Sequence, residues 1–169
     1  MNCEHCGTVF EPRREHGRAR AIAMISEAVW WVTIVDGTLV RYHPSVYDAV
    51  LAGHLPAELR QIEGILAGLR FVRDQMGHDI DHADFIHRQP SRSDLGERRV
   101  AAWKWTSVPE PALTPLPPCG QAWEITRYRS YETHLAHHTI GETFGRAAAF
   151  IKQAAAKATS VSRASARAR

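Results

Sequence analysis

Apolar residues recur at helical spacing from about residue 18 to residue 42, and this pattern predicts a long helix. Its repeating positions are Ile22, Ile25, Val29, Val32 and Leu39. Four more apolar residues widen the surface: Trp30, Trp31, Ile34 and Val35. Because apolar side chains surround so much of it, we expect a central helix that is buried on more than one side.

Two further helices are expected before residue 77. His43-Pro44 ends the first helix, and Ser45 with Asp48 forms a capping-box-like start for a short helix that runs through Leu51. Pro56 opens a third helix. Its apolar positions are Leu59, Ile62, Ile65, Leu66, Leu69, Val72 and Met76.

The second half of the chain alternates extended and helical patterns. Residues 100–108 read as extended, with Trp103 and Trp105 on one side, and a proline-rich connector follows. Helical spacing returns over 121–138, where we expect four buried residues: Ile125, Tyr128, Tyr131 and Leu135. Thr139 and Glu142 form a capping box for a last helix.

These elements predict an all-α fold, a helical bundle of four or five main helices with a Pro-rich connector. We divide the chain into a short ribbon-like segment over 1–16, the bundle over 17–156 and a disordered basic tail over 157–169. The expected core includes Trp30, Val32, Ile62, Leu69 and Val72, with the first and third helices packed together.

The composition is that of a soluble protein, since 44% of the 169 residues are hydrophobic and 23% are charged. The longest uninterrupted apolar stretch, residues 28–35, ends at Asp36 and is too short to span a bilayer. The first residues show no signal-peptide pattern, and three cysteines do not make a disulfide framework. We therefore expect a cytoplasmic protein without membrane contact.

The net charge of +3 is unevenly distributed. Residues 152–169 carry five basic and no acidic side chains, so residues 1–151 sum to about −2, the difference between +3 and +5. A basic tail can contact nucleic acid through its phosphates, although such tails are more often simply solvated.

Arg73, Asp74 and His78 are the candidate catalytic residues. A guanidinium can neutralise charge on phosphoryl oxygens, and an imidazole can move a proton at neutral pH. Together they suffice for RNA cleavage without a metal if the 2′-hydroxyl of the RNA is the nucleophile.

An arginine, a polar residue and then a histidine, at the end of an apolar helix in an all-α chain, resembles the HEPN (higher eukaryotes and prokaryotes nucleotide-binding) superfamily. The resemblance covers residues 18–151, although Ile80 stands where many toxins of the family have tyrosine. It implies a metal-independent endoribonuclease with a toxin or phage-defence role, acting as a homodimer whose two motifs share a cleft. Arg73 would then stabilise the phosphorane, His78 would be the general acid or base, and Asp74 would orient the site.

The N-terminal Cys3-x-x-Cys6-Gly7 pattern is typical of half a zinc site. No second cysteine pair follows, so the remaining ligands would have to come from His5, His16, Cys119 or a second protomer. We therefore expect little or no zinc, and no cofactor for catalysis.

Two alternatives stay open. The segment 78–84 contains two histidines and three aspartates, a density that could hold a divalent metal, with Asp79, Asp81 and His82 as ligands. A non-catalytic helical protein that binds nucleic acid or another protein is the second, with Arg73 and His78 in structural roles. The RNA substrate cannot be read from the chain.

Overall fold

The computed structural model describes residues 12–76, 85–91, 100–108 and 118–167. It contains five helices and one small hairpin of strands, which confirms the all-α class. The helices are α1 (Pro12–Tyr42), α2 (Pro44–Leu51), α3 (Pro56–Met76), α4 (Pro118–His134) and α5 (Ile140–Arg167). The strands β1 (Ile86–Ser91) and β2 (Val100–Trp105) pair antiparallel, with Ile86 opposite Trp105 and Ser91 opposite Val100.

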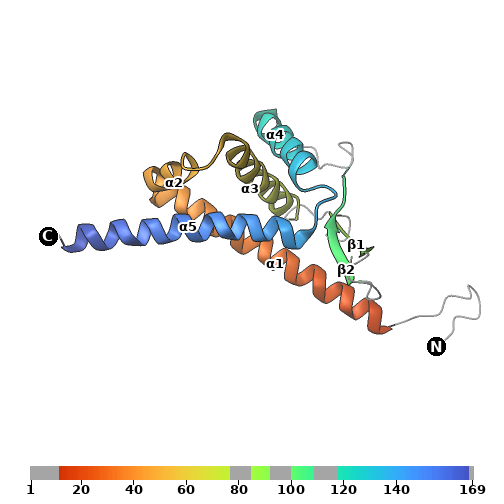
Figure 1. Cartoon of the computed structure of the whole chain (residues 1–169). Helices are drawn as coiled ribbons and strands as arrows, with labels where there is room; N and C mark the ends of the chain where they lie inside the picture. Colours follow the sequence, from red (N-terminus) through yellow and green to blue (C-terminus); the bar gives the residue numbers. More distant parts are fainter. Residues whose placement is uncertain (1–11, 77–84, 92–99, 109–117, 168–169) are drawn as a thin grey trace, which may run out of the picture.

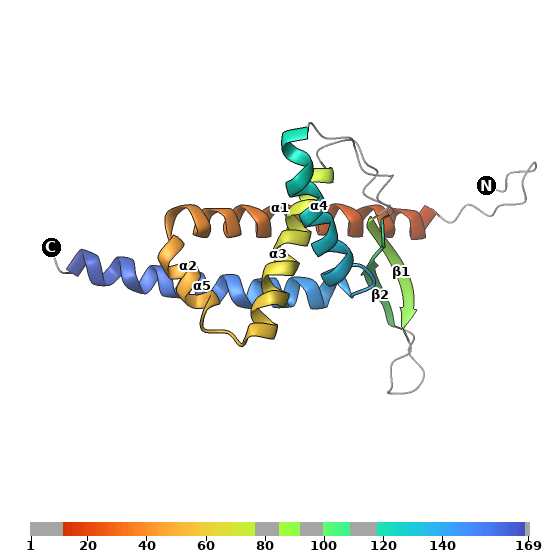
Figure 2. The ribbon, with the colours of Figure 1, turned by 90° about the horizontal axis from the view of Figure 1, so that it is seen from above.

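The helices form two layers. Helices α1 and α5 run in the same direction, and α3 and α4 lie side by side across them at a steep angle (Figure 1, Figure 2). The hairpin packs at one end of this arrangement, next to the first turns of α5. At the opposite end, α5 projects past α2 in both views.

The core lies where the two layers meet. Leu69, Phe71 and Val72 of α3 are buried there, as expected for Leu69 and Val72, whereas Ile62 and Val32 are only partly buried. Tyr131 of α4 and Trp105 of β2 are fully buried and in edge-to-face contact.

Helix α1 is not buried on more than one side, and the expectation that Trp30 belongs to the core is wrong. Trp30 and Trp31 are 54% and 57% exposed, whereas Val29, Asp36 and Leu39 form the buried face. Spacing alone could not settle this, because a helix that is apolar all round has no preferred inner face.

Several helix boundaries also differ from expectation. Helix α1 begins at Pro12, inside the segment 1–16 that was assigned to a ribbon. Helix α2 begins at Pro44 after His43, without a side-chain cap, so Ser45 is not its first residue. The start of α5 is confirmed, because Thr139 Oγ1 accepts a hydrogen bond from Glu142 N at 3.2 Å.

A disordered tail is expected from residue 157, but the structure shows a helix there. Helix α5 continues to Arg167, and the side chains of Ala154 and Ala158 are buried. Apolar or small residues recur at a 3-4 spacing along α5, and this stripe continues beyond residue 157. Its members are Ile140, Phe144, Ala147, Ile151, Ala154, Ala158 and Val161.

Among the described residues, Gly17–Tyr42 is long and apolar enough to cross a membrane by length and composition, since an 18-residue window within it reaches a mean hydropathy of 1.3. The earlier expectation counted only the uninterrupted run over 28–35. Core helices of soluble proteins pass the same test. Here Asp36, in the middle of this segment, bonds to Tyr47 and Arg70 and so ties α1 to α2 and α3.

Candidate functional site at the end of helix α3

Asp74 is the centre of a charged cluster that joins α3 to α4. Its Oδ1 atom accepts hydrogen bonds from Arg73 Nε at 3.0 Å and from Arg73 Nη2 at 2.6 Å. Its Oδ2 atom accepts one from Nη1 of Arg127. One carboxylate therefore holds two guanidinium groups through different oxygens, an arrangement that fixes both in orientation.

The three side chains of this cluster remain accessible to solvent. Arg73 is 31% exposed, and Asp74 and Arg127 are each 25% exposed. The cluster has a net charge of +1, since two cations share one anion. Half-buried arginines of this kind can donate hydrogen bonds to a phosphate while a carboxylate, here Asp74, fixes the orientation of their guanidinium groups.

A second, buried contact lies next to the charged cluster. The Gln75 amide donates a hydrogen bond to Oε1 of Glu124, and both side chains are buried. In the part of the chain that the structure describes, Gln75 Oε1 is one of two buried side-chain atoms without a hydrogen-bond partner. This polar pair links the end of α3 to α4, and removal of the Gln75 amide would leave the buried Glu124 carboxylate without this donor.

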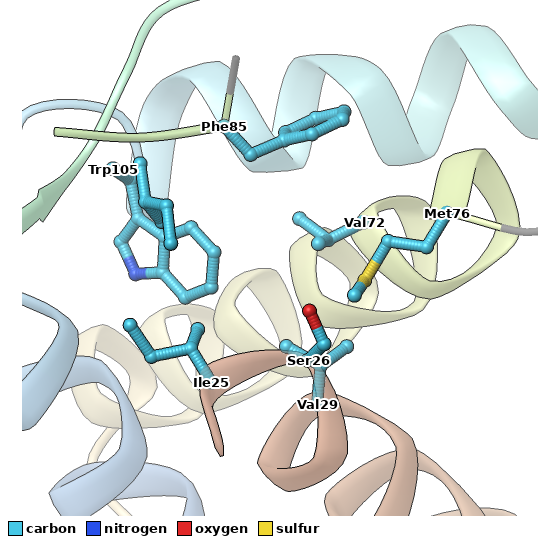
Figure 3. A pocket seen from close by; sticks show the side chains of 8 residues that line it. Ile25, Ser26, Val29, Val72, Met76, Phe85 and Trp105 are labelled. Atoms are coloured by element: carbon cyan, nitrogen blue, oxygen red, sulfur yellow. The ribbon is translucent and has the colours of Figure 1, made fainter. Parts of the chain in front are cut away.

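The opposite side of the same helix end is apolar. Val72 and Met76 point toward Ile25 and Val29 of α1, and Phe85 and Trp105 close the space (Figure 3). The enclosed hollow of ≈ 10 Å³ is about the size of one water molecule, so it is no ligand site. The end of α3 is thus anchored to α1 on one side and to α4 on the other.

The structure brings together two of the three predicted catalytic residues, Arg73 and Asp74. His78 lies outside the described residues, as do Cys3, Cys6, Asp79, Asp81 and His82. His16 falls in the first turns of α1 and Cys119 in the first turn of α4, and their side chains are likewise outside what the structure describes. Among the described residues, no group of three histidine, cysteine or carboxylate side chains is placed to hold a metal ion.

Sequence reasoning missed Arg127, Gln75 and Glu124. A signal for Glu124 was present, since Glu124, Tyr128, Tyr131 and Leu135 follow one another at a 4-3-4 spacing. The expected fourth member, Ile125, is 37% exposed instead. Helical spacing therefore identified the buried face of α4, but an acidic residue on it was passed over in favour of its apolar neighbour.

A groove with a volume of ≈ 230 Å³ and both apolar and polar lining residues lies between the start of α3 and helix α5. His54, Glu58 and Arg146 line it, and His54 Nδ1 is 3.6 Å from Glu58 Oε2. Arg146 is engaged there by Gln61 and Glu142, so its charge is already compensated within the protein.

Comparison with known proteins gives no match to a family model, to a curated protein or to a solved structure.

Proposed function

We propose that this protein cleaves RNA without a metal ion, with Arg73 and His78 as the catalytic pair. The observation that carries the proposal is the contact between Arg73 and Asp74 at the end of α3. The resemblance to HEPN proteins implies that Asp74 orients the site, and its hydrogen bonds with two nitrogens of Arg73 support this role. The cluster supports the proposal on geometry, whereas the role of His78 rests on the resemblance.

The proposed reaction is an internal transesterification. The 2′-hydroxyl attacks the adjacent phosphorus, the bond from phosphorus to the 5′-oxygen breaks, and a 2′,3′-cyclic phosphate and a 5′-hydroxyl are formed. Arg73 stabilises the additional negative charge on the phosphoryl oxygens of the pentavalent state. His78 transfers a proton, and the resemblance places the histidine of a second protomer in the same cleft.

Arg127 extends this site beyond the expected pair. Its guanidinium shares the Asp74 carboxylate with Arg73, so both cations lie on the same surface between α3 and α4. A phosphate next to the scissile one is a natural ligand for Arg127, because planar guanidinium groups bind phosphate oxygens in pairs.

Cleavage assays with the purified protein and single-stranded RNA test the proposal. Arg73→Ala and His78→Ala should each abolish cleavage, whereas Arg60→Ala, on the exposed side of the same helix, should not change it. Activity should survive EDTA, and the products should end in 2′,3′-cyclic phosphate or its hydrolysed form. Cleavage that requires magnesium would instead favour a metal site at Asp79, Asp81 and His82.

A second candidate function is that of a non-catalytic interaction protein, and one observation favours it. Helix α1 exposes Met24, Trp30, Trp31 and Tyr42, more large apolar surface than a monomeric protein usually leaves uncovered on one helix. A protein that cleaves no RNA and keeps normal partner binding after His78→Ala would support this function. Because α1 and the Arg73 cluster are different surfaces, partner binding through α1 and RNA cleavage can be measured separately.

A further inference from the structure

Helix α1 has a regular apolar stripe on the face that points away from the bundle. We define the outer stripe as six residues at alternating spacings of four and three: Met24, Ala28, Trp31, Val35, Thr38 and Tyr42. Met24, Trp31 and Tyr42 are each more than half exposed, and Val35 is 38% exposed. Every position of the stripe is apolar or small, and none carries a charge.

The stripe lies on a different side of α1 from the residues that hold this helix in the protein, and its Val35 and Thr38 border α5. That inner face is fixed by Val29, by Leu39 and by the contacts of Asp36 with Tyr47 and Arg70. Among the described residues, the packing of α1 therefore uses one apolar face, and the large side chains of the outer stripe remain exposed. A 3-4 spacing over about two and a half turns on each side of residue 33 is the pattern by which two helices pack along each other.

We infer that the outer stripe binds the same stripe of a second copy of this chain, with the two α1 helices antiparallel. A two-fold axis near Thr33 and Ile34 places Trp31 against Val35 of the second copy. The same register places Ala28 against Thr38 and Met24 against Tyr42. Large residues then meet at the centre and at both ends, and small residues between them let the helices approach closely.

Charge complementarity selects this orientation. Glu27 and Arg41 are exposed and lie on the same flank of the stripe. In the antiparallel pair, Glu27 faces Arg41 of the second copy, and the symmetry produces this ion pair twice. In a parallel pair, Glu27 would lie level with Glu27 of the second copy and Arg41 level with Arg41, which removes both attractions.

A groove beside the outer stripe can accommodate the indole side chain of Trp31 from the second copy. The groove between the second half of α1 and the end of α5 has a volume of ≈ 370 Å³ and is lined by Val35, Thr38, Ala158 and Ser162. Trp31 of the second copy, packed on Val35, reaches the mouth of this groove. An indole side chain fits such a space, and aromatic residues in a pocket commonly supply most of the energy of an interface.

The dimer can be tested independently of the proposed RNA chemistry, by sedimentation equilibrium of the full chain. Trp31→Glu should weaken self-association at least about a hundredfold, because it places a charge at the centre of an apolar interface. Leu55→Glu is the matched control, since Leu55 is 69% exposed and lies far from the stripe on the turn before α3. This control should leave the dissociation constant unchanged.

A charge exchange tests the orientation. Glu27→Arg and Arg41→Glu should each weaken the dimer about tenfold, and the double variant should recover the affinity of the original chain. Failure of the double variant to recover would overturn the antiparallel register. A monomer at all accessible concentrations, or a dimer insensitive to Trp31→Glu, would overturn the interface itself. Binding of the monomer to phosphatidylcholine vesicles, lost with Trp31→Glu, would assign the stripe to a lipid surface instead.

Discussion

Gly68 of α3 lies against Tyr131 of α4, so closely that a methyl group on Gly68 would come 3.1 Å from the Tyr131 Cα atom. The same methyl group would meet Cδ1 of Leu135 at 2.7 Å. One turn earlier, Gly64 lies under the ring of His134. Two glycines four residues apart therefore give α3 a flat strip on which α4 rests.

Gly68→Ala should destabilise the protein by about 1–3 kcal/mol, because the backbone at Tyr131 cannot move aside as a flexible side chain would. Gly145→Ala is the control, since an added methyl group there meets no atom within 4 Å. That control should stabilise α5 by roughly 0.5–1 kcal/mol, the difference in helix propensity. Urea denaturation of the two variants measures both effects, and equal stabilities would contradict the close packing of α3 on α4.

Asp36 is a fully buried acid at the junction of three helices. It accepts a hydrogen bond from the Tyr47 hydroxyl at 2.6 Å and pairs with Arg70. Burial, and next the contact with this carboxylate, raise the pKa of Tyr47 above its ordinary value, so the hydroxyl stays a donor.

Asp36→Ala should cost about 3 kcal/mol or more, because it leaves Arg70 and the Tyr47 hydroxyl unpaired at the junction. Tyr47→Phe removes one hydrogen bond only and should cost about 1 kcal/mol. Asp48→Ala, at an exposed position of α2, should change stability by less than about 0.5 kcal/mol. If Asp36→Ala were as mild as Asp48→Ala, the ion pair would not hold α1 to α3.

The contacts of Asp36 could not be predicted from the sequence. In the sequence it marked the end of an apolar run, and nothing local indicates that its partners lie 11 and 34 residues away. Helix α3 was predictable in full, because Pro56 fixes its start and its apolar residues keep one period to Met76. Its glycines carried no such signal, since the need for close contact arises only when α4 is in place.

The Arg73 cluster also combines one contact that the sequence could predict with one that it could not. The pairing of Arg73 with Asp74 joins neighbours in sequence and could be expected from the motif. Arg127 is 53 residues from Asp74, and only the packing of α4 along α3 brings it to the same carboxylate. The buried face of α1 was predicted wrongly for a related reason. Both sides of this helix are apolar, and the sequence does not show which side packs against the rest of the described residues.

His134 gives the protein a pH dependence in the acidic range. Burial against Gly64, and next the charge of His138, lower its pKa below the ordinary value of 6.5. The unfolded chain therefore binds a proton more readily than the folded chain does. The stability contributed by neutral His134 is complete above pH 6.5 and is lost as the pH falls through the lowered pKa.

His134→Gln should remove this part of the pH dependence. The free energy of unfolding of the original chain should fall as the pH decreases below 6.5, and the variant should show a smaller decline over the same range. Chemical denaturation at several pH values compares the two curves. Parallel curves would assign the acid sensitivity to other groups.

The C-terminal part of helix α5 contains a section that packs against the core and a section that projects into solvent. Ala154 and Ala158 are buried, whereas Val161 is 46% exposed. The C-terminal end of α5 extends past α2 (Figure 1). A chain that ends after Gln153 loses both buried alanines and should be less stable by about 1–2 kcal/mol, a fall in Tm of roughly 2–8 °C. A chain that ends after Ser162 keeps them and should have the same Tm as the full-length protein.

The Tm values of the three chains are compared by thermal unfolding at concentrations low enough to keep any dimer dissociated, so that only contacts within one chain contribute. Equal melting of all three chains would show that α5 does not contribute to the core beyond residue 153.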